Sequence, residues 1–307
     1  MSRICILGGT GFVGRHLAAR LVARGHDVEV LTRHRFLHTD MLVLPTLTLV
    51  QADVYDPGVL REAFIGCDAV INLVGILNER GHKGRGFAEA HVTLTAAVLE
   101  ACRGAGLRRL LHMSALNAEI HGPSHYLRTK GTAEQMVLAA KHLDATVFEP
   151  SVIFGPGDSF LRRFAGLAKR MPLVFPLAFP KARFKPVYVG DVTEAFVYCL
   201  ENRAGIGQRY ALCGPKIYTL RELVAYAVKL SARRRLILGL PRPVAWLQAA
   251  IMEWLPGKPF SLDNYHSLTR DNVSEDDGLA ALHIRAKPLE AVAPLYLSGA
   301  RHVRLGL

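Results

Sequence analysis

Three regularly spaced glycines near the start of the chain constrain its fold more than any other feature. They follow the apolar run 4–7 and open the helix-like segment 12–24: Gly8, Gly11 and Gly14. In such a turn Gly8 permits the tight reversal, Gly11 lets the backbone approach a pyrophosphate, and Gly14 lets the helix pack close to the sheet. The free N–H groups at the start of the helix then favour a negatively charged ligand. The turn therefore predicts a dinucleotide-binding site.

The rest of the first half alternates between strand-like and helix-like patterns. Short apolar runs predict strands at 28–32, 47–50, 69–74, 109–114 and 145–148. Apolar residues at helical spacing predict helices at 59–65, 87–103 and 126–141. Because strands that alternate with helices form parallel sheets, residues 1–150 are predicted to be an α/β Rossmann domain with a doubly wound parallel sheet.

The alternating pattern ends after residue 150. Four prolines between residues 172 and 186 separate short apolar pieces. Farther on, Thr219 and Glu222 have the spacing of a capping box and predict a helix that runs to about Ser231. Residues 151–307 are therefore predicted to form a smaller C-terminal α/β lobe, interleaved with the Rossmann core, that contacts a substrate or a partner.

Residues around the glycine turn and after the next two strands are expected to bind the cofactor. The turn contributes Gly8, Thr10, Gly11, Phe12, Val13 and Gly14. At the end of the second strand there is no carboxylate for a ribose hydroxyl, and Arg33 can present a planar guanidinium to a 2′-phosphate. This favours NADP(H) over NAD(H); the alternative is that Arg33 and Arg35 are solvated loop charges. Asp53, followed by Val54, is expected to bind the adenine amino group or, alternatively, to cap a turn.

Three polar residues form a candidate catalytic group. Tyr126 and Lys130 lie four residues apart on a predicted helix, so they share one face of it. A nearby ammonium group lowers the pKa of a phenol, which makes Tyr126 a general acid or base. Ser114 ends the preceding strand, at the carboxyl edge where α/β sheets bind ligands, and its hydroxyl can polarise a carbonyl group.

Together these motifs resemble a known family. The glycine turn, Asn72-Leu73-Val74-Gly75, Ser114, Tyr126 with Lys130, and residues 150–158 occur in the order found in extended or atypical short-chain dehydrogenase/reductases, which are NAD-dependent epimerase/dehydratase-like. The resemblance covers most of residues 1–230. Segments such as 126–128, 151–161 and 240–243 are similar to the branch that contains the nucleotide-binding accessory subunit of respiratory complex I and its bacterial relatives.

The resemblance implies roles for these residues. Tyr126 is expected to be the acid or base, Lys130 to bind the cofactor ribose and activate the tyrosine, and Ser114 to orient the substrate. The segment Leu73, Val74 and Gly75, together with Pro150 and Val152, is expected to lie along the cofactor. In the complex I branch, the nucleotide is generally thought to be NADPH held for structure. One departure from the family pattern is Glu149, where relatives commonly carry arginine.

The most membrane-like stretch of the chain spans residues 233–256. Three arginines precede an apolar segment with both tryptophans of the chain, and only Gln248 and Glu253 are polar between Val244 and Leu255. The favoured interpretation is a helix that covers the C-terminal lobe and closes an apolar pocket; the alternative is a helix in the interface of an anionic membrane. Either interpretation suits an apolar small-molecule substrate.

The net charge of +12 is concentrated in the second half, where residues 151–307 carry 22 basic and 12 acidic residues. This surplus suits an anionic membrane or a phosphorylated ligand, or it is a solvated basic face. No aromatic platforms or DNA-reading helix pair accompany it, so no nucleic-acid partner is expected.

The 13 histidines and five cysteines lack metal-ligand spacing, so we expect no metal and reduced thiols. The predicted location is cytoplasmic, with peripheral binding to the inner face of the cytoplasmic membrane left open.

Three functions remain open from the sequence. The first is an NADP(H)-dependent oxidoreductase that acts on a carbonyl or alcohol of a quinone, isoprenoid or lipid-like substrate. The second is a non-catalytic protein that holds NADPH and assists or assembles with a membrane respiratory complex. The third is a sugar-nucleotide epimerase or dehydratase that uses the same residues.

Overall fold

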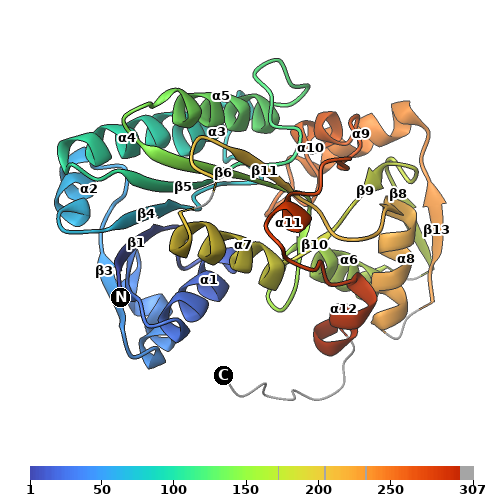
Figure 1. Cartoon of the computed structure of the whole chain (residues 1–307). Helices are drawn as coiled ribbons and strands as arrows, with labels where there is room; N and C mark the ends of the chain where they lie inside the picture. The colour runs from blue at the N-terminus through green and yellow to red at the C-terminus, as the bar shows by residue number, and fades with distance from the viewer. Residues whose placement is uncertain (172, 204, 232–233, 298–307) are drawn as a thin grey trace.

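The central sheet of the protein consists of seven parallel strands in the order β11-β6-β5-β4-β1-β2-β3 (Figure 1). The computed structural model describes residues 1–171, 173–203, 205–231 and 234–297. The strands are β1 (Arg3–Leu7), β2 (Asp27–Thr32), β3 (Leu47–Gln51), β4 (Ala69–Asn72), β5 (Arg109–Met113), β6 (Asp144–Pro150) and β11 (Arg209–Leu212). The strand order reverses between β1 and β4, so the loops after these strands meet at the carboxyl edge. The predicted doubly wound parallel sheet is confirmed.

Helices cover both faces of the sheet. One face carries α1 (Phe12–Ala23) and α7 (Val189–Glu201). The other carries α2 (Pro57–Phe64), α4 (Leu94–Gly104) and α5 (His125–Ala139). The helices predicted in the first half are therefore present, although α4 covers only the second part of the helix predicted at 87–103.

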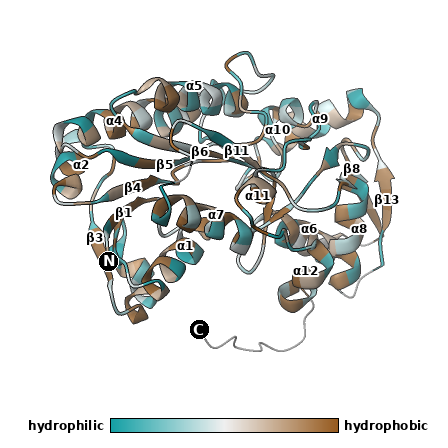
Figure 2. Ribbon diagram, viewed as in Figure 1, coloured by the Kyte–Doolittle hydropathy of each residue, from teal (hydrophilic) through white to brown (hydrophobic). Residues whose placement is uncertain are grey.

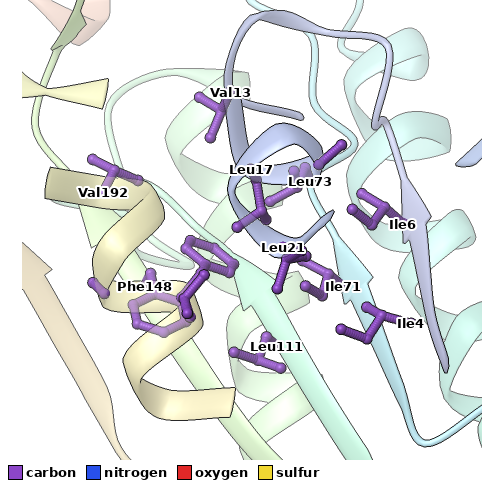
Figure 3. Close-up of a cluster of buried hydrophobic side chains, with 14 of the residues drawn as sticks. Ile4, Ile6, Val13, Leu17, Leu21, Ile71, Leu73, Leu111, Phe148 and Val192 are labelled. Carbon is purple, nitrogen blue, oxygen red and sulfur yellow. The ribbon is translucent and has the colours of Figure 1, made fainter. Parts of the chain in front are cut away.

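The two apolar cores explain why the chain folds in this way. Along β1, Ile4 and Ile6 point into the core beneath α1 and α7, whereas Cys5 and Leu7 point into the core beneath α2 and α4. Figure 3 shows the first of these cores, where Phe148 of β6 lies among side chains of α1 and α7. Because both faces are covered, the strands are apolar on both sides, as parallel strands require.

The second half of the chain forms the C-terminal lobe around its own apolar core. Three strand pairs belong to it: β7 (Ile153–Phe154) with β10 (Val187–Tyr188), β8 (Val174–Leu177) with β13 (Leu236–Gly239), and β9 (Arg183–Phe184) with β12 (Tyr218–Thr219). Its helices are α6 (Phe160–Arg170), α8 (Leu220–Leu230), α9 (Arg242–Met252), α10 (Leu262–Ser267), α11 (Gly278–Ala281) and α12 (Leu289–Leu297). The predicted capping box of Thr219 and Glu222 is confirmed at the start of α8.

The second half also contributes to the central sheet, since β11 pairs with β6 and α7 packs against α1. Among the short elements of the first half, the 3-10 helix η1 (Arg35–Val43) has no counterpart in the sequence patterns. The elements α3 (Arg85–Phe87) and the π-helical turn η2 (Ala88–Thr93) lead into α4, and η2 lies within the helix predicted at 87–103. Among the described helices, none combines the length and apolarity needed to cross a membrane.

Helix α9 differs from the favoured sequence interpretation. It was expected to cover the C-terminal lobe and close an apolar pocket; it packs against α10, but only Ala245 and Ala249 of the helix are buried. The larger side chains are exposed, among them Trp246, Leu247 and Ile251. The helix therefore buries its small residues and leaves its large apolar side chains outside, so the expected closure of an apolar pocket by these side chains is not found.

Candidate active site

The glycine turn between β1 and α1 leaves backbone amides free at the carboxyl edge of the sheet. Gly11 is the N-cap of α1, no side chain caps the helix, and its first turn contains no acidic residue. A Cβ atom on Gly14 would lie 2.4 Å from the carbonyl oxygen of Gly8 and 2.5 Å from the Cα atom of Gly9. Gly8 itself has a positive φ of 77°. The turn therefore has no room for side chains at these glycines, and its backbone N–H groups can bind a diphosphate.

The loop after β4 lies against this turn. A Cβ atom on Gly8 would lie 3.1 Å from backbone atoms of Leu73 and Val74, so the two loops are in close contact. The Oδ1 atom of Asn72 accepts a hydrogen bond from the N–H of Val74 at 3.1 Å and shapes the loop. At its end, a Cβ atom on Gly75 would lie 3.1 Å from Nζ of Lys130. The structure thus brings the glycine turn, the β4 loop and Lys130 together at the carboxyl edge of the sheet.

The remaining predicted cofactor residues near the turn occupy two strand ends. Thr10 and Phe12 are half-buried on the turn, and Val13 is buried in the core, which leaves only its backbone for a ligand. Pro150 ends β6, and Val152 follows it, half-buried, at the same edge of the sheet. Their contact with a cofactor remains a prediction.

Arg33 and Asp53 follow the ends of β2 and β3 and are both exposed. Within the described parts of the chain, the guanidinium of Arg33 forms no ion pair and no hydrogen bond, so all its donors are available for a ligand. The Oδ1 atom of Asp53 accepts from the N–H of Tyr55 at 3.1 Å, as in the alternative in which it caps a turn. Its second carboxylate oxygen is left to bind an amino group.

Tyr126 and Lys130 lie on one face of α5, as their spacing predicted. Nζ of Lys130 donates to the carbonyl oxygen of Met113 at 2.9 Å and to that of Val74 at 3.4 Å. The ring of Tyr126 contacts the rings of Phe87 and His91 edge-on, with centroids 6.1 and 5.7 Å apart. Burial lowers the pKa of Lys130 to about 8.

The expected decrease in the pKa of Tyr126 is not found. Burial of the phenol, together with the carboxylate of Asp263, raises the pKa of Tyr126 to about 12. The physical reason is that burial and the nearby Asp263 carboxylate both disfavour the charged phenolate. Tyr126 is therefore a neutral phenol at neutral pH, able to donate a proton.

Ser114 is held by a buried carboxylate. Its hydroxyl donates to Oε2 of Glu134 at 2.7 Å, and Glu134 also accepts from Arg209 at 3.3 Å. Burial and the nearby Glu134 carboxyl, to which it is hydrogen-bonded, raise the pKa of Glu149 to about 8. A protonated Glu149 carboxyl can thus remain hydrogen-bonded to Glu134 inside the protein. The substrate-orienting role of Ser114 remains a prediction, since no hydrogen bond joins Ser114 to Tyr126 in the described structure.

Sequence patterns missed two buried histidines beside Lys130. His91 lies on η2, where Nδ1 is 2.8 Å from Oγ1 of Thr129 and Nε2 accepts from the N–H of Ile76 at 3.2 Å. Burial, with a contribution from Lys130, lowers the pKa of His91 to about 2 and that of His112 to about 3. In the described structure, neither ring nitrogen of His112 has a hydrogen-bond partner. Both rings are neutral and add no charge near Tyr126.

The C-terminal lobe caps the start of the helix that carries Tyr126. Asp263 of α10 accepts hydrogen bonds from the N–H groups of His125 and Tyr126 at 2.6 and 3.2 Å. A cavity of about 310 Å³ lies at this junction, lined by Ser124, His125 and Arg128 of the α5 start, and by Lys258 and Asp263 among others. Nothing in the local sequence signals this contact, because the partners are 137 and 138 residues apart.

Comparisons with known proteins agree with this geometry. The model of the NAD dependent epimerase/dehydratase family matches residues 4–213. The chain is 30% identical over 302 residues to NADH dehydrogenase [ubiquinone] 1 alpha subcomplex subunit 9, mitochondrial, of Mus musculus, with 93% of this chain and 77% of that protein covered. It is 28% identical over 251 residues to the ceramide reductase of Caulobacter vibrioides, with 81% and 77% covered.

A solved structure shares the fold. It is a double mutant of DesIV, a dTDP-glucose 4,6-dehydratase from Streptomyces venezuelae, with NAD and DAU bound. The TM-score is 0.72 at 19% identity, with 96% of this chain and 95% of that chain covered. At this identity the similarity establishes the fold alone.

Proposed function

Because the chain belongs to the NAD-dependent epimerase/dehydratase family, we propose that it is an NADP(H)-dependent oxidoreductase that interconverts a carbonyl and an alcohol on an apolar, lipid-like substrate. The observation that carries the proposal is the arrangement of Tyr126 and Lys130. Both lie on one face of α5, and Nζ of Lys130 reaches the loop that adjoins the glycine turn. This arrangement supports a proton donor close to a dinucleotide bound at the glycine turn.

In the proposed reaction each residue has a defined task. The amides of the glycine turn bind the diphosphate, and Lys130 binds the ribose hydroxyls that face it. Tyr126 donates its phenolic proton to the substrate oxygen during reduction and takes it back during oxidation. The neutral form of Tyr126 suits reduction, because the oxygen that develops on the substrate is a stronger base than a phenolate. A bound nicotinamide supplies or accepts the hydride.

Arg33 is proposed to select NADP(H). Replacing it by alanine is expected to weaken NADPH binding roughly tenfold to a hundredfold, because a charge-assisted contact to phosphate is worth about 1.5–3 kcal/mol. NADH binding should change little. Arg35, the next arginine along the chain and also exposed, provides the matched control. Titration of both variants with both nucleotides measures the effect, and equal loss of NADH and NADPH affinity in Arg33→Ala would argue against this role.

The rate of reduction is expected to fall as pH rises through about 8. Burial lowers the pKa of Lys130 to about 8, so its ammonium group is present below that pH and is lost above it. The rate of NADPH oxidation should then fall about tenfold per pH unit above this value. In Lys130→Arg the charge does not titrate, so this inflection should disappear even where the rate is lower. A flat profile up to about pH 10 in the unmodified protein would contradict the assignment.

The surroundings of the site support the proposed substrate class. A cavity beside the start of α5 has polar walls that suit a head group, and the adjoining lobe exposes apolar side chains that suit a hydrocarbon chain. The similarity to a ceramide reductase supports a lipid-like substrate. The direct test measures NADPH oxidation with long-chain ketones, quinones and sugar nucleotides. Turnover of the apolar carbonyls supports the proposal, whereas turnover of sugar nucleotides alone would overturn it.

A second function is favoured by the 30% identity to a respiratory-chain subunit over 93% of this chain. In this alternative the protein holds NADPH as part of a membrane respiratory complex and turns over no substrate. Native mass spectrometry of the purified protein distinguishes the two accounts when it is combined with the substrate panel. Tightly retained NADPH with no turnover, and co-purification with a respiratory complex, would favour the alternative.

A further inference from the structure

Helix α9 presents its large apolar side chains to the outside of the molecule. Its buried residues are small, Ala245 and Ala249, and the helix packs against α10. The exposed side chains recur at helical spacing and continue just past the helix: Val244, Leu247, Ile251, Trp254 and Leu255, with Trp246 beside them. A soluble helix normally has the opposite arrangement, with large apolar residues inward and polar residues outward. We call this set of six side chains the α9 surface.

Apolar exposure continues from α9 into the strands that precede it. β13 leads directly into α9, and its Leu236 and Leu238 are exposed. The paired strand β8 adds Val174, and Leu173 precedes it. These elements lie at the same end of the lobe, where β13 is coloured brown in Figure 2 (Figures 1 and 2). An exposed apolar region spread over three adjoining elements indicates an interaction site.

The charges along this segment are almost all positive. Residues 231–260 contain five basic residues and one acidic residue: Arg233, Arg234, Arg235, Arg242 and Lys258 against Glu253. Glu253 is partly buried and pairs with His82, whereas Arg234 and Arg242 are exposed. The α9 surface is therefore flanked by cations and, within the described residues of this segment, by no free carboxylate.

Large apolar side chains, tryptophans and flanking cations are the combination that anionic bilayers bind. Tryptophan is favoured at the depth of the lipid head groups, and each arginine near an anionic surface strengthens binding roughly fivefold. We propose that the α9 surface docks on an anionic lipid bilayer, with α9 lying in the plane of the interface. A protein partner would require acidic side chains opposite these arginines and is the competing outcome of the test.

Docking in this way would place the cavity at the start of α5 close to the membrane. The segment that follows α9 forms part of the wall of this cavity through Glu253, Lys258 and Leu262. A lipid held in the bilayer would then reach the cavity without crossing water. The docking proposal itself depends only on the α9 surface and stands whether or not the protein is an enzyme.

Intrinsic fluorescence provides a specific test, because the chain has only two tryptophans and both belong to the α9 surface. The full-length protein is mixed with vesicles of phosphatidylcholine alone, or of phosphatidylcholine with about one third phosphatidylglycerol. With the anionic vesicles we expect a blue shift of the emission, quenching by brominated lipid and co-sedimentation. Neutral vesicles and high salt should weaken all three signals at least about tenfold.

Matched variants test whether vesicle binding depends on the α9 surface or on exposed apolar side chains anywhere on the protein. Leu247→Ser combined with Ile251→Ser keeps both tryptophans as probes and should reduce vesicle binding at least about tenfold. The control replaces Leu37 and Val43 of η1 by serine, since each is 72% exposed on a different element. The control should bind like the unmodified protein, and both variants should keep their thermal unfolding midpoint.

Several results would overturn the proposal. One is the absence of a spectral shift with anionic vesicles. Another is equal loss of vesicle binding in the η1 control. A third is self-association or binding to an acidic protein through the α9 surface with no affinity for lipid, which would assign the surface to a protein partner.

Discussion

Replacing Tyr126 by phenylalanine is expected to reduce turnover of a carbonyl substrate by about a hundredfold to ten-thousandfold, the usual contribution of a positioned general acid. The substitution removes only the phenolic oxygen. In the described structure that oxygen forms no hydrogen bond, and the ring contacts with Phe87 and His91 are retained by phenylalanine. The affinity for NADPH and the unfolding temperature should therefore remain nearly unchanged.

The control for this variant is Tyr198→Phe on α7, which removes the same atom on the opposite face of the sheet. It should have the turnover of the unmodified protein. Steady-state kinetics and nucleotide titration are measured for both variants. Unchanged turnover in Tyr126→Phe would remove Tyr126 from the mechanism, and a parallel loss of NADPH affinity would assign it to binding.

Replacing Gly14 by alanine is expected to reduce the affinity for NADPH by about a hundredfold or more. The added Cβ atom would lie 2.4 Å from the carbonyl oxygen of Gly8 and 2.5 Å from the Cα atom of Gly9, and backbone atoms cannot rotate away as a side chain can. The glycine turn must therefore move away from α1. Loss of two charge-assisted hydrogen bonds to the diphosphate would account for an effect of this size.

A matched control is Gly166→Ala on α6, where an added Cβ atom meets nothing within 4 Å and alanine favours the helix. This variant should bind NADPH normally. If Gly14→Ala unfolds, Gly11→Ala is the milder test, because its Cβ atom would lie 3.2 Å from the carbonyl oxygen of Gly8. Normal NADPH affinity in a folded Gly14→Ala variant would show that the turn does not hold the diphosphate.

The sequence predicts the parts of this fold that depend on local periodicity. The strand, glycine turn and helix at residues 3–23 are recognisable because each has its own pattern and they adjoin one another. The capping box at Thr219 is equally local. The pairing of β11 with β6 and the packing of α7 on α1 join segments far apart in the chain, and no periodicity encodes such contacts.

The same distinction applies to the site. Helical spacing predicts that Tyr126 and Lys130 share one face of a helix, and in the structure both lie on one face of α5. The bond from Ser114 to Glu134 and the capping of α5 by Asp263 join separate elements, so only the structure reveals them. The pKa of Tyr126 was mispredicted for a related reason, since spacing identifies a neighbouring charge but does not reveal how deeply a phenol is buried.

The prediction for α9 was wrong for a different reason. Its apolar residues are numerous enough to cover a core, and composition does not reveal which face of a helix packs. In the structure the small face with Ala245 and Ala249 is buried, so the large residues remain outside. This outcome is what makes the segment a candidate for membrane docking.

Titration calorimetry of the purified protein with NADPH and with NADH tests the central claim most directly. The account predicts saturable binding of one NADPH per chain with a roughly micromolar dissociation constant, and weaker binding of NADH. Binding of neither nucleotide up to about millimolar concentration would contradict the assignment of the glycine turn and of every function proposed for this site.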